Sequence, residues 1–198
     1  MTQPYNIGVK KVSPDGTEII CFFTKKFIYS NFYLCNIEID GKILCCSEQY
    51  YMFQKAKVFK QPLLAESIMN CAVPAVIKNY GRDVEKAVKL KTGKFDYDQW
   101  HKIAIQIMMI ACLRKFQQHP YLRHHLLESN GAILVEASKT DFYWGAGKSM
   151  DQIVDTNWTG ENVLGRLLML IRDRMLSKEH ISHVKRRIQE KTKKKKSE

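Results

Sequence analysis

The chain has 198 residues, of which 45% are hydrophobic and 11% are aromatic. This share of apolar side chains is large enough to build a core, so the composition excludes a chain that is disordered throughout. The net charge of +12 favours a partner that carries phosphate groups. The charge is uneven, however, because residues 177–198 contain nine basic and three acidic residues and so carry half of the excess.

The six cysteines form no C-x-x-C pair, and we expect reduced thiols in a cytoplasmic or nuclear protein that is not secreted. No stretch has the ~18 consecutive apolar residues that a membrane span requires. The amino terminus also lacks the apolar run of a secretory signal. The basic end of the chain is compatible with a nuclear-localisation signal, with a nucleic-acid-binding arm, or with a solvated terminus that aids solubility.

Strands are expected early in the chain. Residues 17–23 are rich in β-branched and aromatic side chains. Residues 35–39 and 43–45 flank the pair Asp40-Gly41, which is a strong signal for a two-residue hairpin turn.

Helices dominate the sequence from residue 47 onward. Ser47 is the expected N-cap of the first helix, and Pro62 and Pro74 each indicate the first turn of a further helix. Gly81 is expected to end the helix that follows Pro74. A long helix is then predicted over residues 96–118.

The last part of the chain alternates between element types. A short helix over residues 121–129 precedes a strand over residues 132–137. A loop rich in glycine and aromatic residues follows at 141–147, and a helix over residues 166–176 closes the body.

This order of elements predicts the α+β class, mostly helical, with a small antiparallel sheet. We expect an N-terminal extension over residues 1–16, a single domain over residues 17–176, and a basic tail over residues 177–198 that is flexible or helical. We make no prediction of the oligomeric state.

Two residues of the first helix could carry chemistry. Glu48 and Lys55 are seven residues apart, which is two helical turns, so they project from nearly the same face. They could be a carboxylic general acid or base beside a nucleophilic lysine. They could equally be an exposed pair without a chemical role, and the spacing alone leaves both interpretations open.

Two later segments could contact a ligand. Gly145 and Gly147, next to Trp144, would let the backbone approach a phosphate or a sugar; a tight surface loop is the alternative. Asn162 and Gly165 at a helix start could hold an anion or a ribose hydroxyl, although a plain N-cap role for Asn162 fits equally well.

Seven motifs occur in order along residues 19–176. They are Phe27-x-x-Ser30-Asn31-Phe32-Tyr33, Asp40-Gly41-Lys42, Ser47-Glu48-Gln49-Tyr50-Tyr51-Met52-Phe53-Gln54-Lys55-Ala56, Gly81-Arg82 with Trp100, Leu134-Val135-Glu136-Ala137, Asp141-x-x-Trp144-Gly145-x-Gly147, and Trp158-x-Gly160-x-Asn162-x-Leu164-Gly165. In this order the motifs resemble the NADAR family, also called YbiA-like.

The resemblance implies hydrolysis of N-glycosidic bonds in phosphorylated ribosyl compounds. The first candidate reaction removes ADP-ribose, as product, from the guanine base of an ADP-ribosylated nucleoside or nucleic acid. A second candidate acts on ribosylaminopyrimidine intermediates of riboflavin biosynthesis. The third is a module that binds ADP-ribose or nucleic acid without catalysis. The resemblance implies no metal, no other cofactor and no membrane partner.

The resemblance also assigns roles to residues. Lys55 would form a Schiff base with the sugar, Glu48 would transfer protons, and Asp141 would hold ribose hydroxyls or act as a second carboxylate. One departure is Gln49, where relatives often have histidine. The substrate-binding candidates that it implies are Ser30, Asn31, Phe32, Tyr50, Gly81, Arg82, Trp100, Trp144, Gly145, Gly147, Asn162 and Gly165.

Overall fold

The computed structural model describes residues 5–196, without the side chains of residue 180 and residues 183–196. The elements of this part of the chain are, in order, β1 (Val9–Val12), β2 (Glu18–Phe22), β3 (Ile37–Ile39), β4 (Lys42–Leu44), α1 (Ser47–Val58), α2 (Pro62–Met69), α3 (Pro74–Thr92), α4 (Tyr97–Gln118), α5 (Pro120–Glu128), β5 (Ile133–Glu136) and α6 (Val163–Lys196).

The strands form two small sheets. One has the order β1-β2-β5, and the other is the hairpin of β3 and β4. Asp40 and Gly41 both have positive φ in this hairpin, at 52° and 72°, as a type I′ turn requires. The predicted α+β class is confirmed. The larger sheet is not wholly antiparallel, because β5 pairs parallel to β2 after a long helical crossover.

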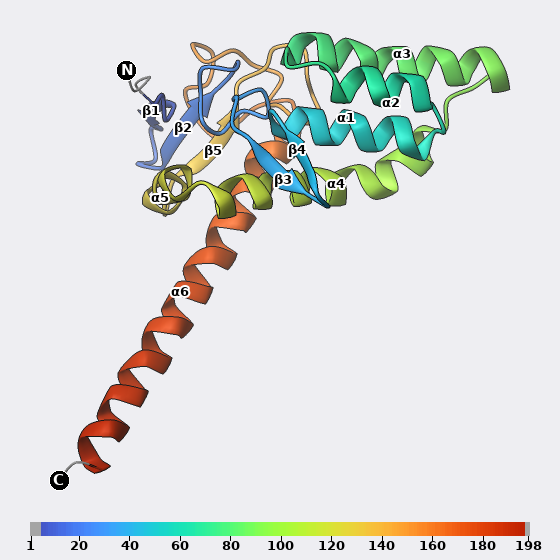
Figure 1. Cartoon of the computed structure of the whole chain (residues 1–198). Helices are drawn as coiled ribbons and strands as arrows, with labels where there is room; N and C mark the ends of the chain where they lie inside the picture. Colours follow the sequence, from blue (N-terminus) through green and yellow to red (C-terminus); the bar gives the residue numbers. More distant parts are fainter. Residues whose placement is uncertain (1–4, 197–198) are drawn as a thin grey trace.

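The helices lie mainly on one side of the larger sheet (Figure 1). Helix α1 packs against α2, α3 and α4, and the buried side chains Phe22, Met108 and Leu168 belong to one core that joins the helices to the sheet. Helix α1 is therefore held from several sides, which fixes the direction in which its side chains project.

Two predicted helix boundaries need correction. The N-cap of α1 is Cys46 rather than Ser47. Helix α3 does not end at Gly81 but continues to Thr92, where Gly93 adopts the left-handed conformation (φ 78°) of a C-terminal glycine. Gly81 instead permits close packing, because a Cβ atom there would clash with Met52 Sδ on α1.

Regular structure extends beyond both ends of the predicted domain, and in the tail it is the helical form, one of the two that the sequence predicts. Val9–Val12, inside the expected N-terminal extension, form β1 and pair antiparallel with β2. Helix α6 begins three residues before the predicted Arg166 and continues through the basic segment to Lys196. Figure 1 shows α6 extending away from the body as a single helix. Residues 1–4 and 197–198 lie outside the described residues.

All six cysteines are free thiols, as predicted. Cys45 and Cys46 follow β4 and have their Sγ atoms 3.8 Å apart, so they do not point to opposite faces as they would on a strand. In the part of the chain that the structure describes, no helix has both the length and the apolar character needed to cross a membrane.

Candidate functional site

A cavity of about 680 Å³ lies between α1, α3, α4 and the loops that flank β2 and β5. It contains carboxylates, amines, amides and aromatic rings. The lining residues used below are Lys25, Ser30, Asn31, Phe32, Glu48, Tyr51, Met52, Lys55, Lys78, Arg82, Glu85, Tyr97, Trp100, Glu136, Asp141, Tyr143, Trp144 and Leu164.

Helix α1 supplies the two residues singled out by their spacing. Glu48 and Lys55 each have only 5% of their surface exposed, and both line the cavity. Met52 lies between them on the same face and contributes to the same wall. The interpretation of Glu48 and Lys55 as an exposed pair is therefore excluded.

Lys55 has one charged partner and two aromatic neighbours. Its Nζ atom forms an ion pair with Glu85 of α3, and Glu85 Oε2 also accepts a hydrogen bond from Tyr97 Oη at 3.1 Å. The same Nζ atom lies 5.3 Å from the centre of the Phe95 ring and 5.6 Å from that of Trp100. Glu85 is thus placed to accept a proton from the buried amine.

Glu48 has an unusual protonation equilibrium. Burial raises the pKa of its carboxyl group from 4.5 to about 7, and the negative charge of Asp141 adds to the rise, while Lys78 and Lys55 oppose it. A carboxylic acid with a pKa near neutrality can both donate and accept a proton at physiological pH.

Glu136, the last residue of β5, is a further acid of the cavity. Burial raises the pKa of its carboxyl group from 4.5 to about 8, and the charges of Asp141 and Glu48 act in the same direction against Lys78 and Lys115. Its Oε2 atom is buried and has no hydrogen-bond partner among the described residues. Two neighbouring glutamic acids therefore keep their protons at pH values where an exposed glutamate is ionised.

Asp141 has a structural task in addition to its place in the cavity. Its Oδ1 atom accepts hydrogen bonds from the backbone N–H of Tyr143 at 3.2 Å and of Trp144 at 2.8 Å. These bonds hold the loop that follows β5 in the turn that an aspartate side chain typically stabilises. They also place Trp144 at the cavity wall.

Aromatic rings form one wall. The Tyr51 ring centre is 5.0 Å from that of Trp100 and 5.5 Å from that of Trp144, the latter at 84°. Trp100 Nε1 donates a hydrogen bond to Tyr51 Oη at 3.1 Å. These contacts fix flat apolar surfaces against which a planar base can pack.

The loop between β2 and β3 contributes another part of the cavity wall. The backbone N–H of Glu48 donates to the carbonyl oxygen of Asn31 at 3.1 Å. Ser30 Oγ accepts from the Phe32 N–H at 3.1 Å, and Lys115 Nζ donates to the Ser30 carbonyl at 2.8 Å. The Ser-Asn-Phe motif is thus tied to the start of α1.

The structure brings nine of the predicted site residues to one cavity and leaves six outside its lining. The nine are Lys55, Glu48, Asp141, Ser30, Asn31, Phe32, Arg82, Trp100 and Trp144. The six are Tyr50, Gly81, Gly145, Gly147, Asn162 and Gly165.

Two of the six lie in the packing around α1. Tyr50 is one residue from Tyr51 and so projects in another direction, where it packs in a buried cluster with Ile37 and Leu44. Gly81 is buried at the crossing of α3 and α1. Their positions are explained by packing.

The other four hold loops and strands together. A Cβ atom at Gly145 would lie 2.8 Å from the Asp141 carbonyl oxygen, and one at Gly165 would clash with that of Leu134. Gly147 has a φ of 69°. Asn162 Nδ2 donates to the Leu134 carbonyl at 2.9 Å. Gly145 and Gly165 therefore let protein backbone approach closely, and Gly147 packs against the side chains of Phe142 and Thr159.

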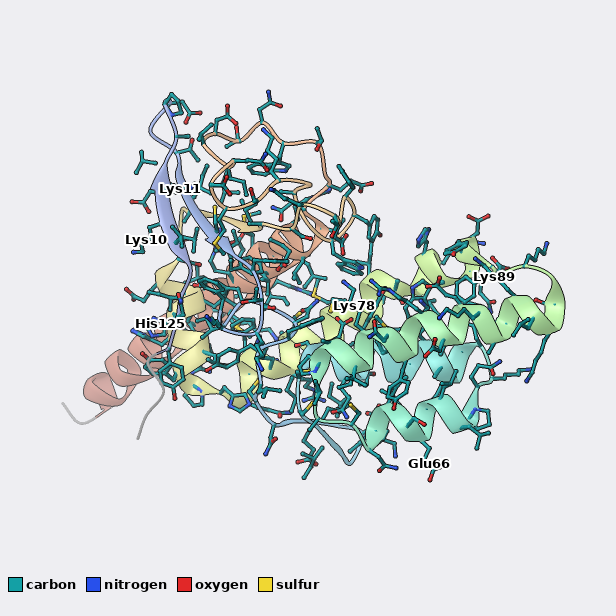
Figure 2. The ribbon with its side chains drawn as sticks, turned by 90° about the horizontal axis from the view of Figure 1, so that it is seen from above. Lys10, Lys11, Glu66, Lys78, Lys89 and His125 are labelled. Atoms are coloured by element: carbon teal, nitrogen blue, oxygen red, sulfur yellow. The ribbon has the colours of Figure 1, made fainter. Side chains whose placement is uncertain are left out.

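Four charged residues of the cavity were not predicted as site residues: Lys25, Lys78, Glu85 and Glu136. Lys78 and Glu85 lie on α3, one before and one after the expected helix stop at Gly81. They are seven residues apart, the same spacing as Glu48 and Lys55, and this periodicity could have identified them had the helix been continued. Figure 2 shows Lys78 near the middle of the molecule and Lys89 at the far end of α3.

The family model of the NADAR domain matches residues 21–176, which includes every residue of the cavity described above. The chain belongs to the NADAR family. Within the described residues, no group of three or more His, Cys, Asp or Glu side chains is arranged to hold a metal ion.

Two relatives of this NADAR protein cover most of the chain. It is 33% identical over 186 residues to Protein irg-1 of Caenorhabditis elegans, with 85% of each chain covered. It is 34% identical over 147 residues to N-glycosidase YbiA of Escherichia coli, covering 74% of this chain and 80% of YbiA. The NMR structure of YbiA superposes with a TM-score of 0.66 and 29% identity, covering 89% of this chain and 95% of YbiA.

A third relative has a different name. The chain is 29% identical over 146 residues to riboflavin biosynthesis protein VVA0006 of Vibrio vulnificus, covering 74% of this chain and 35% of that longer protein. This NADAR protein is accordingly classed with hydrolases that cleave N-glycosyl bonds, and its homologues include a protein named for riboflavin biosynthesis.

Proposed function

We propose that this NADAR protein removes ADP-ribose from guanine bases by hydrolysing the N-glycosyl bond, with Lys55 as the nucleophile. The observation that carries the proposal is the placement of a buried amine and a buried carboxylic acid, Lys55 and Glu48, in one cavity. Rings of Trp100 and Trp144 form part of its wall. Binding alone would not require an amine at this depth.

The first step opens the ribose ring. Glu48 gives its proton to the ring oxygen, the bond between C1 and that oxygen breaks, and the lone pair of the base nitrogen forms a C1–N double bond. The raised pKa of Glu48 keeps the acid protonated near neutral pH, as this donation requires. The product is an open-chain iminium ion that carries one positive charge.

Lys55 then replaces the base. Glu85 accepts the proton of the ion-paired ammonium group, and the neutral amine adds to C1. A second proton passes from the lysine nitrogen to the base nitrogen, the bond between C1 and the base breaks, and guanine leaves as a neutral amine. C1 is now joined to Lys55 as a protonated Schiff base, so one difficult hydrolysis has become two easier steps.

Water completes the reaction. The Glu48 carboxylate takes a proton from water as the oxygen adds to C1 of the Schiff base. The hydroxyl proton of this adduct then passes to the lysine nitrogen, the C1–N bond breaks, and the aldehyde of ADP-ribose and a neutral lysine amine result. The 4-hydroxyl group closes the ring again. Glu48 ends protonated and the proton taken up by Glu85 returns to the lysine amine, so both groups regain their starting states.

The charges at the mouth of the cavity support a substrate with phosphates. Lys25, Lys78 and Arg82 line it, and Lys78 Nζ also lies 5.8 Å from the centre of the Phe32 ring. The aromatic wall would stack a base, and the cations would attract the diphosphate. Both ends of an ADP-ribosylated nucleoside therefore have partners of suitable chemistry.

The second candidate is an N-glycosidase that acts on phosphorylated ribosylaminopyrimidines. The name of the Vibrio vulnificus relative favours it, and the same amine and acid would serve, because the bond again joins ribose C1 to an amino nitrogen. This substrate has one phosphate and no adenosine, so it would leave more of the cavity empty.

Trapping tests the proposal. Incubation with an oligonucleotide that carries ADP-ribosylated guanine, in the presence of borohydride, should reduce the Schiff base to a stable amine on Lys55, detected by mass spectrometry of its peptide. Lys57, exposed on the same helix, is the internal control and should stay unmodified. Guanine release without any adduct would contradict the Schiff-base intermediate but would still support hydrolysis of the N-glycosyl bond.

The alternatives give different outcomes in the same assay. Faster turnover of a ribosylaminopyrimidine phosphate than of the ADP-ribosylated oligonucleotide would favour the second candidate. Tight binding of ADP-ribose with no turnover of either substrate would show a binding module and would overturn the proposal.

A further inference from the structure

Hydrogen bonds to its backbone N–H and carbonyl groups hold Glu136 in place. Its N–H donates to Asn162 Oδ1 at 3.0 Å. Its carbonyl oxygen accepts from the N–H of Ala146 and from that of Ser138, each at 2.9 Å. Both main-chain groups are thus satisfied within the protein, and the carboxyl group is what Glu136 has left to offer to a ligand.

One oxygen of that carboxyl group lacks a partner among the residues that the structure describes. Glu136 lines the cavity, yet its buried Oε2 atom has no hydrogen-bond partner among the described residues. A buried polar atom without a partner costs free energy, and proteins keep few of them unless a ligand or water satisfies them. The arrangement indicates that a bound molecule supplies the missing hydrogen bond.

The surroundings limit the chemistry of that molecule. The charges that influence Glu136 most are the negative Asp141 and the positive Lys78, followed by Glu48 and Lys115. A phosphate would meet acids here, whereas a hydroxyl group can both donate to and accept from a carboxyl group. A neutral polyol is therefore the best fit at this end of the cavity.

We propose that Glu136 binds the 2-hydroxyl group of the ribosyl unit and makes the site selective for ribosyl over 2-deoxyribosyl compounds. The identity of the sugar rests on the proposed function. Glu48 and Lys55 act at C1 in that reaction, and the 2-hydroxyl group is on the adjacent carbon. Glu136 is then a substrate-binding residue that the sequence motifs did not single out.

Selectivity follows from the same hydrogen bond. A 2-deoxy sugar would leave the buried carboxyl group unpaired, and a site built around a substrate hydroxyl rejects an analogue that lacks it more strongly than a site that merely tolerates it. One hydrogen bond to a buried partner corresponds to roughly a 10- to 100-fold preference.

Calorimetric binding of two probes, ribose 5-phosphate and 2-deoxyribose 5-phosphate, tests the proposal without any turnover. The unaltered protein should bind the ribose compound about 10- to 100-fold more tightly. Glu136→Met should lose most of this preference by weakening only the ribose compound. Glu66→Met is the matched control, because Glu66 is exposed on α2 and distant from Lys78 in Figure 2; it should keep the preference.

Several results would overturn the inference. They are equal binding of the two sugars by the unaltered protein, an undiminished preference in Glu136→Met, or no detectable binding of either probe. Should Glu136→Met fail to fold, arabinose 5-phosphate, whose 2-hydroxyl group is inverted, replaces the variant and should bind the unaltered protein as weakly as the 2-deoxy sugar. Selective binding without turnover would reject the proposed reaction and leave this inference standing.

Discussion

The floor and the rim of the cavity differ in how far their charged side chains are buried, and therefore in whether these side chains are ionised. We define the floor as the acids Glu48 and Glu136 and the rim as the exposed cations Lys25 and Arg82. On the floor, burial raises the pKa of Glu48 and Glu136 to about 7 and about 8. On the rim, Lys25 and Arg82 are exposed to water.

The difference shows that depth, more than the number of charges, decides what a charged residue can do here. A buried acid loses hydration and holds its proton, so it becomes a proton donor near neutral pH. An exposed cation stays hydrated and acts through a field that salt screens. The body therefore attracts phosphates at its surface and offers acids at the depth where a sugar would react.

Lys55→Met should have the largest effect, because it removes the amine beside the floor while keeping a side chain of similar length. We expect turnover of the ADP-ribosylated oligonucleotide to fall by at least about 10³-fold, since the covalent route is lost. Single-turnover rates give the measurement. Lys57→Met, two residues along the same helix, should change the rate less than about twofold; an equal loss in both variants would argue against a specific role for Lys55.

The pH profile of the reaction should reveal the floor acid Glu48. Its pKa is raised to about 7, so it is protonated below this pH and ionised above it. Because the first step needs the protonated form, kcat/KM should decline about tenfold per pH unit above pH 7. Glu48→Gln should lower kcat by about 10²- to 10⁴-fold and abolish this decline. A decline that persists in Glu48→Gln would assign it to another group.

Stability should show the cost of the other floor acid. Folded Glu136 holds its proton up to about pH 8, because burial raises the pKa of its carboxyl group from 4.5 to about 8. Its stabilising contribution is therefore complete below pH 4.5 and lost as the pH rises through 8. The side chain of Glu136→Gln cannot ionise. Above pH 8 the free energy of unfolding of this variant should therefore exceed that of the unaltered protein, by at most a few kcal/mol.

Urea unfolding at acid and alkaline pH measures this difference. The gain of Glu136→Gln over the parent should be close to zero at the acid pH and clear at the alkaline one. Glu66→Gln, at an exposed position, should show no such pH dependence. The same small gain at both pH values would mean that Glu136 ionises like an exposed glutamate.

Arg82→Met should have the smallest effect, because the rim side chain is exposed and its field is screened. We expect KM to rise about two- to fivefold at low salt and the difference to vanish near 1 M salt, with kcat unchanged. Steady-state kinetics at several salt concentrations provide the readout. Lys91→Met, an equal change of charge at an exposed position near the C-terminal end of α3, is the control and should leave KM unaltered at every concentration.

Glu48 and Lys55 were predictable from local periodicity, whereas Ser30, Asn31, Phe32, Arg82 and Trp100 were implied only by the resemblance to the family. The spacing of Glu48 and Lys55 placed both on one face of a helix, and α1 presents both to the cavity. The hairpin at Asp40-Gly41 follows from the backbone freedom of these two residue types. Patterns of this kind depend on a few neighbouring residues, so contacts between distant segments do not change the local structure that they predict.

The rest depended on contacts between distant segments. A glycine such as Gly81 is typical of a helix end, but here its lack of a side chain allows the contact with Met52. Because the helix was predicted to end at Gly81, Glu85 was not placed on the same helix face as Lys78. The role of Glu136 could not be inferred from β5 alone, because the burial of its carboxyl group depends on the loop that Asn162 and Ala146 hold against it. Strand β1 was missed because its residues are mostly exposed.

Helix α6 separates two parts of the chain by a fixed length. Leu164 lines the cavity and Lys196 is the last residue of the same helix. At 1.5 Å per residue the two are about 48 Å apart along the axis. A label or a surface linkage attached at residue 196 would therefore be held at this distance from the cavity, which would leave its entrance accessible while the protein is immobilised.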